Sequence, residues 1–163
     1  MGSFPYFPLV MVFTPTYLSA TNLASIFLAD SIDAETAEDD VCIIRKQYIT
    51  SLWMDLEENM IRFSSHLSTF RLNTIDLEKL VNRMNNEIGG LKITYDDYTN
   101  PDGSKDLIFS YDHLLKGDAT ICPKTLLFLH YKFERLIYES SLIYRENYLC
   151  KSIDYKQLEM PIG

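Results

Sequence analysis

The sequence predicts an α+β protein that is mostly helical, with three to four helices packed against a small antiparallel β-hairpin or sheet. Three observations predict this class. Apolar residues recur at helical spacing over about 39–70, two further helical patterns cover 74–88 and 123–147, and two β-prone segments with a turn between them lie within about 91–111. The chain has 163 residues, of which 47% are hydrophobic, so we expect a single domain over 1–163 with a substantial core.

The strongest pattern is the run over 39–70, where apolar residues recur every three or four positions. They are Val41, Ile44, Tyr48, Leu52, Leu56, Met60, Phe63 and Leu67. Charged residues such as Arg45, Asp55 and Glu58 fall between them. The period is nearer that of a straight helix than the 3.5 residues of a coiled coil. The pattern therefore predicts one long, central amphipathic helix.

The remaining elements have weaker but definite signals. Residues 16–30 predict a helix, and the acidic stretch 30–40 predicts a loop. Thr74 is a candidate cap for the helix at 74–88, which Gly89-Gly90 would end. The segments LKITYDDY and KDLIFSY flank the turn residues TNPDGS, which predicts a hairpin. Pro123 suits the first turn of the last helix, whose apolar residues extend almost all round it.

The two ends of the chain are predicted to lie outside the packed elements. Prolines at positions 5, 8 and 15 disfavour a helix over 1–15, so this apolar segment is expected to form an arm that packs on a partner. Residues 156–163 are expected to form an exposed tail. The apolar run over 4–13 is too short to span a bilayer, so the sequence predicts no membrane span.

The net charge of −8 disfavours binding to nucleic acid, because a phosphate backbone repels an acidic surface on which basic residues do not cluster. No Lys or Arg precedes Arg45, whereas six acids do: Asp30, Asp33, Glu35, Glu38, Asp39 and Asp40. A solvated acidic loop explains this stretch better than a docking site for a basic partner. Cys42, Cys122 and Cys150 are too far apart for a zinc motif or a disulfide framework, which favours an intracellular location, cytoplasmic or nuclear.

No motif for catalysis, metal binding or cofactor binding is recognisable, so we predict no catalytic residue, no metal and no cofactor. His130 and Glu134 lie four apart on the last predicted helix, but they supply two ligands at most, and a histidine bonded to Glu134 is the simpler interpretation. Cys122 lies at the predicted start of the same helix, where the helix dipole activates a thiol. A small enzyme with a Cys/His site at Cys122 and His113 is therefore an alternative.

The function that the sequence favours is a non-catalytic protein–protein interaction subunit of a homo- or hetero-oligomeric complex. A helix that is apolar almost all round needs cover from several sides, and a protein partner or self-association would supply it. The predicted contact residues lie in the apolar arm and on the last helix: Phe4, Tyr6, Phe7, Leu9, Tyr131, Tyr138 and Tyr144. A second alternative is a host-directed effector or inhibitor that binds a cellular protein.

Overall fold

The computed structural model describes residues 16–45, 49–69, 72–115, 117 and 120–149. The predicted arm and tail, and with them Phe4, Tyr6, Phe7 and Leu9, lie outside the described residues. Within these ranges the chain forms three helices and eight strands. In chain order they are β1 (Thr16–Tyr17), α2 (Ala20–Ala29), β2 (Ala34–Ala37), β3 (Asp40–Ile44), β4 (Ile49–Asp55), β5 (Met60–Ser68), α3 (Thr74–Glu87), β6 (Lys92–Tyr95), β7 (Asp106–Leu114), β8 (Thr120–Ile121) and α4 (Pro123–Leu149).

The dominant element is a six-stranded antiparallel sheet in the order β2-β3-β4-β5-β7-β6, and β1 and β8 form a separate two-stranded pair. The prediction of a mostly helical protein is therefore wrong, since the fold is a sheet-rich α+β architecture. The hairpin predicted within 91–111 does form, because β6 pairs with β7 in antiparallel register. It is the edge of a larger sheet and not a small sheet of its own.

The long helix predicted over 39–70 does not exist, because this stretch forms β3, β4 and β5. The sequence also carries an alternating pattern that fits these strands. In β5, Ile61 and Phe63 are fully buried on one face, whereas Arg62 and Ser64 point to the other. The spacings of three and four residues mix positions on both faces of the strands with a turn residue. Val41 and Phe63 are buried, Ile44 and Met60 lie on the opposite face, and Leu56 is exposed in the β4–β5 turn.

A tight turn between β4 and β5 interrupts the stretch 39–70, which was predicted to be one continuous helix. The Asp55 carboxylate accepts hydrogen bonds from the backbone amides of Glu57 and Glu58, both at 3.0 Å. Asn59 then adopts a left-handed conformation with φ of 52°. Its side-chain amide donates to the carbonyls of Leu115 and Gly117, which fixes the turn against the end of β7.

The other helices form where the sequence predicts them, with local corrections. The first helix, α2, begins after Ser19, whose hydroxyl accepts from the Asn22 amide, and α3 begins after Asn73 and not at a Thr74 cap. The last helix, α4, begins at Pro123 as expected. The stretch 30–40 is not simply a loop, because it contains β2 and a two-residue turn to β3 in which Glu38 has a φ of 55°.

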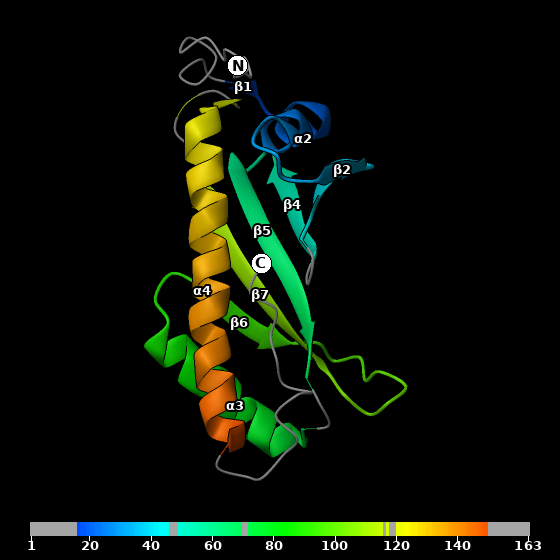
Figure 1. Cartoon of the computed structure of the whole chain (residues 1–163), viewed down its shortest axis with the longest axis vertical. Helices are drawn as coiled ribbons and strands as arrows, with labels where there is room; N and C mark the ends of the chain where they lie inside the picture. The colour runs from blue at the N-terminus through cyan, green and yellow to red at the C-terminus, as the bar shows by residue number, and fades with distance from the viewer. Residues whose placement is uncertain (1–15, 46–48, 70–71, 116, 118–119, 150–163) are drawn as a thin grey trace, which may run out of the picture.

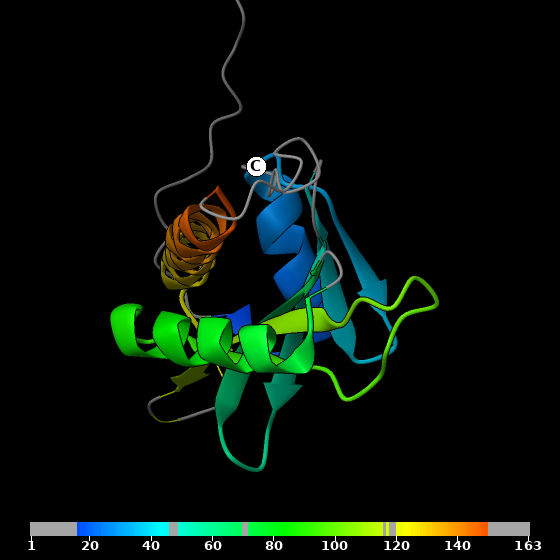
Figure 2. The ribbon, with the colours of Figure 1, turned by 90° about the horizontal axis from the view of Figure 1, so that it is seen from below.

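The helices and the inner face of the sheet share one core. Figure 1 shows α4 running along the length of the molecule, with α2 near one end and α3 near the other, and Figure 2 shows α3 crossing the end of α4. Phe63 on β5 packs against Phe133 on α4 with ring centroids 5.7 Å apart. Leu23 and Phe27 of α2 and Leu77 of α3 belong to the same core cluster.

We predict that Phe63→Ala lowers the free energy of unfolding by about 3–5 kcal/mol, because it leaves a cavity between β5 and α4. The measurement is urea denaturation followed by circular dichroism. The matched control is Leu56→Ala, since Leu56 is 60% exposed in the β4–β5 turn and its loss should change stability by less than about 0.5 kcal/mol. Equal effects of the two variants would contradict the packing of α4 on β5.

Candidate functional site

The clearest candidate surface is the outward face of α4. Four large apolar side chains are exposed there: Phe128 (65%), Tyr131 (45%), Tyr138 (40%) and Leu142 (45%). With Arg135 they follow one another at steps of three, four, three and four residues, so they lie along one side of the helix. We call these five residues the α4 stripe. Leu126, Leu129 and Phe133 lie on the buried side, so the described residues cover α4 on one face only.

The three tyrosines that the sequence proposed on this helix do not share one environment. Tyr131 and Tyr138 lie on the α4 stripe, whereas Tyr144 is 2% exposed and belongs to the core. Phe128, Arg135 and Leu142 were not proposed as contact residues. Their three-and-four spacing with the two exposed tyrosines could have identified them, once the buried side of the helix was known.

One end of the stripe is fixed to α2. The Tyr131 hydroxyl donates a hydrogen bond of 2.8 Å to Asp30 Oδ2, just beyond the last residue of α2. This hydrogen bond, together with burial and the charge of Asp30, raises the pKa of Tyr131 above its ordinary value. Because the hydroxyl is held, the half-exposed ring has a defined orientation, which reduces the entropy lost when a partner packs on it.

Beneath the stripe lies a polar cluster formed by His130, Glu134 and Arg45. Arg45 Nε and Nη2 donate to the two oxygens of Glu134 at 2.6 and 3.2 Å, which ties the end of β3 to α4. His130 is fully buried, and its Nε2 lies 3.0 Å from Glu134 Oε1, although the contact lacks hydrogen-bond geometry. Its ring packs edge-on against Phe27 at 5.3 Å. The cluster is thus enclosed by the core, which suits a structural role.

The alternative Cys/His site has a partial structural counterpart. His113 points to the same face of the sheet as its cross-strand neighbour Ile61, toward α4. Burial and the positive charge of Lys132 lower the pKa of His113 below its ordinary value. Cys122 precedes Lys132 by ten residues, which corresponds to about 15 Å along the helix. The lysine that lowers the pKa of His113 is thus well removed along the chain from Cys122, whose thiol the alternative site requires.

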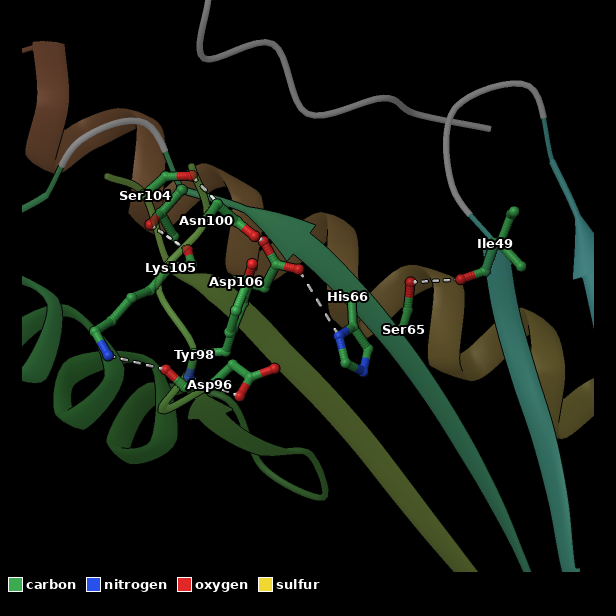
Figure 3. Close-up of polar contacts among 10 residues, drawn as sticks. Ile49, Ser65, His66, Asp96, Tyr98, Asn100, Ser104, Lys105 and Asp106 are labelled. Carbon is green, nitrogen blue, oxygen red and sulfur yellow. Dashed lines mark hydrogen bonds and ion pairs between the residues drawn. The ribbon is translucent and has the colours of Figure 1, made fainter. Parts of the chain in front are cut away.

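A second polar cluster lies at the end of β5, where the β6–β7 loop meets the outer face of the sheet (Figure 3). His66 Nδ1 lies 4.0 Å from Asp106 Oδ2, and Asn100 Nδ2 donates to Asp106 Oδ1 at 2.8 Å. An aspartate beside a histidine occurs in catalytic triads. Here the neighbouring Ser65 is buried on the opposite face and donates to the Ile49 carbonyl at 3.1 Å. The cluster therefore fixes the loop and does not activate that serine.

The outer face of the sheet carries exposed apolar side chains, Ile49, Trp53 and Leu114, beside charged ones. Arg62 pairs with Asp112 on the next strand, with Nη2 and Oδ2 2.8 Å apart, and its guanidinium lies over the Trp53 ring at 5.6 Å. The pair lowers the pKa of Asp112 and raises that of Arg62. The exposed indole of Trp53 is thus already in contact with a charged partner from its own chain.

Two features are absent from the described residues. Among them, no group of three or more His, Cys, Asp or Glu side chains is placed to hold a metal ion. None of the helices in this part of the chain is both long and apolar enough to cross a membrane.

Comparison with known proteins shows the fold but no family. No protein-family model matches the chain, and no curated protein matches its sequence. Among solved structures, the chain is similar to YbjN from E. coli, a candidate transcription regulator, with a TM-score of 0.62 and 13% sequence identity. The similarity covers 82% of this chain and 95% of YbjN. At this identity the comparison establishes a shared fold.

We predict that Glu134→Ala lowers the free energy of unfolding by roughly 1–3 kcal/mol, because it leaves Arg45 half-buried without the carboxylate that binds it at two points. The control is Glu87→Ala, which removes an exposed pair with Arg83 on α3 and should cost less than about 0.5 kcal/mol. Chemical denaturation measures both. A cost for Glu134→Ala no larger than that of the control would contradict a stabilising role for the cluster.

We also predict that the imidazole of His113 titrates below its ordinary pKa of 6.5 in the folded protein. Because the pKa is lower in the folded state, the unfolded state binds the proton more readily as the pH falls below 6.5. Protonation of His113 therefore lowers the free energy of unfolding at acidic pH and has no effect on it above pH 6.5. NMR titration of the imidazole measures the pKa, and Lys132→Gln should raise it by removing a positive charge. An unchanged pKa in that variant would refute the influence of Lys132.

Proposed function

We propose that this protein is a non-catalytic protein–protein interaction subunit and that the α4 stripe is its contact surface. The observation that carries the proposal is the alignment of Phe128, Tyr131, Tyr138 and Leu142 on the uncovered side of α4. Single exposed apolar residues are common on protein surfaces. Four on one helix face, spread over about 21 Å, form a continuous apolar strip of the kind that marks interaction sites.

The composition of the stripe also supports a protein partner. Phe, Tyr and Arg are enriched in protein interfaces, and they account for all of the stripe except Leu142. The three-and-four spacing suits a helix that packs alongside α4, because alternating steps of this kind form the contact seam of paired helices. The partner is therefore expected to present a helix with its own apolar seam.

Two other readings have less support. Direct binding to nucleic acid is opposed by the net charge of −8, so a role in transcription of the kind described for YbjN would act through protein contacts. The Cys122/His113 enzyme has a weaker basis, because it draws on two separate elements: His113 lies on β7, and Cys122 lies just before α4. An intracellular location and a host-directed partner remain compatible with the same contact surface.

The test is affinity purification of the tagged full-length chain from cells that produce it naturally, followed by mass spectrometry. We predict that Tyr138→Lys lowers the recovery of specific partners by about tenfold, because loss of a central interface aromatic weakens the free energy of binding by about 1–2 kcal/mol or more. An untagged copy of the chain itself counts as a partner. The melting temperature of the variant should stay close to that of the wild type, because Tyr138 is 40% exposed.

The matched control is Ile75→Lys, which places the same charge on another exposed apolar residue, 65% exposed at the start of α3. This variant should recover partners as the wild type does. The proposal fails if Tyr138→Lys and the control recover the same partners in the same amounts.

A further inference from the structure

The α4 stripe is nearly symmetric about its central residue. Counted from Arg135, Phe128 and Leu142 lie seven residues before and after it, and Tyr131 and Tyr138 lie four before and three after it. A helix with such a seam can pair with an identical helix that runs in the opposite direction, because a two-fold axis at the centre then matches each half with the other. A second copy of the chain meets this condition directly, because its seam has nearly the same spacing when read in the opposite direction.

We propose that the partner of the α4 stripe is a second copy of this chain, with the two α4 helices antiparallel about a two-fold axis at Arg135. This inference rests on the proposed function of the stripe. The pairing places Phe128 level with Leu142 of the second copy and Tyr131 within one residue, about 1.5 Å, of the level of Tyr138 of the second copy. Each contact occurs twice, so all four exposed apolar side chains are covered.

The charges that flank the stripe favour this orientation. Lys132 and Glu139 are seven residues apart, so they lie on the same side of the seam. Antiparallel pairing about Arg135 brings Lys132 within one residue, about 1.5 Å, of the level of Glu139 of the second copy, and the reverse contact forms by symmetry. Parallel pairing would instead place this flank of one copy on the opposite side of the seam from the same flank of the other, so the Lys132–Glu139 contact would not form.

The central arginine is compatible with the axis. The Arg135 side chain is 77% exposed, and its Nε donates to Glu139 Oε1 of the same helix at 3.2 Å. This carboxylate offsets the positive charge of Arg135, and the exposed guanidinium keeps its contact with water when the seam closes. Two arginines near the axis therefore do not prevent pairing, although they add no attraction of their own.

The edge strand β2 is a poorer site for self-pairing. Glu35, Glu38 and Asp39 are exposed on and beside it, and two copies joined at this edge would bring these carboxylates together. Burial, followed by the charges of Asp39 and Glu38, already raises the pKa of Asp40 within a single chain. Like-charge repulsion thus protects this edge of the sheet, whereas the one like-charged contact in the α4 stripe, between the two Arg135 side chains, is offset by Glu139 on each helix.

The expected dimer is weak. A seam of about 21 Å between two helices buries less than the roughly 1,600 Å² of a standard interface, so we expect a dissociation constant in the micromolar range. Sedimentation equilibrium of the purified full chain from about 1 µM to 1 mM should show a monomer–dimer equilibrium. A chain that remains monomeric throughout this range overturns the inference.

Charge reversal tests the orientation. Lys132→Glu and Glu139→Lys should each weaken the dimer about tenfold, because each turns two attractive contacts into repulsive ones, and the double variant should restore most of the affinity. Lys79→Glu on α3 is the control and should leave the dimer unchanged. Single variants without effect, or a double variant as weak as the singles, would overturn the antiparallel register.

A second measurement uses the unmodified sequence. A zero-length carbodiimide reagent should join Lys132 to Glu139 in a mixture of ¹⁴N- and ¹⁵N-labelled protein, and mixed-isotope peptides identify links between copies. Absence of this mixed link from a cross-linked dimer would contradict the register. If the chain is monomeric but Tyr138→Lys still loses a different partner from cells, the second-copy inference fails while the proposed function stands.

Discussion

The packing of α4 across the inner face of the sheet is the contact on which the rest of the structure depends. Phe63 and Phe133 meet at its centre, and Arg45 and Glu134 join the sheet to the helix beside them. A six-stranded sheet with one apolar face needs such a cover, because its buried rows would otherwise be exposed to water. Because this face of α4 is buried in the core, the described residues leave the opposite face exposed, and the α4 stripe lies there.

His130, Glu134 and Arg45 lie beside this contact, and the packing of α4 on the sheet also explains their role. A histidine, a glutamate and an arginine on neighbouring elements resemble parts of a catalytic site in outline. His130, however, is fully buried among aromatic rings, and both Glu134 oxygens accept from Arg45. The charges of Arg45 and Glu134 offset one another at the edge of the core, whereas both ring nitrogens of His130 are buried without a hydrogen-bond partner.

The sequence supports two interpretations over 39–70, and the helical one is wrong for a specific reason. Apolar residues at steps of three and four occur there, but Ile61, Phe63 and Leu67 of β5 also fall at even spacing, with a polar residue on each side of every one after Ile61. Local patterns do not choose between them, because strand pairing depends on residues far away, such as Phe109 beside Ser65. The turn signal at Asp55 and Asn59, read with the alternation, points toward the observed hairpin.

By itself the sequence determined the elements whose signals are local: α3 with its stop at Gly89-Gly90, the β6–β7 hairpin around its Asn-Pro-Asp-Gly turn, and α4 from Pro123. Caps, turns and stops act over a few residues, so they can be recognised without the fold. Only the tertiary structure decided that 39–70 forms three strands and that Tyr144 is buried while Tyr131 and Tyr138 are exposed. Burial depends on which elements pack together, and that is set by contacts between distant parts of the chain.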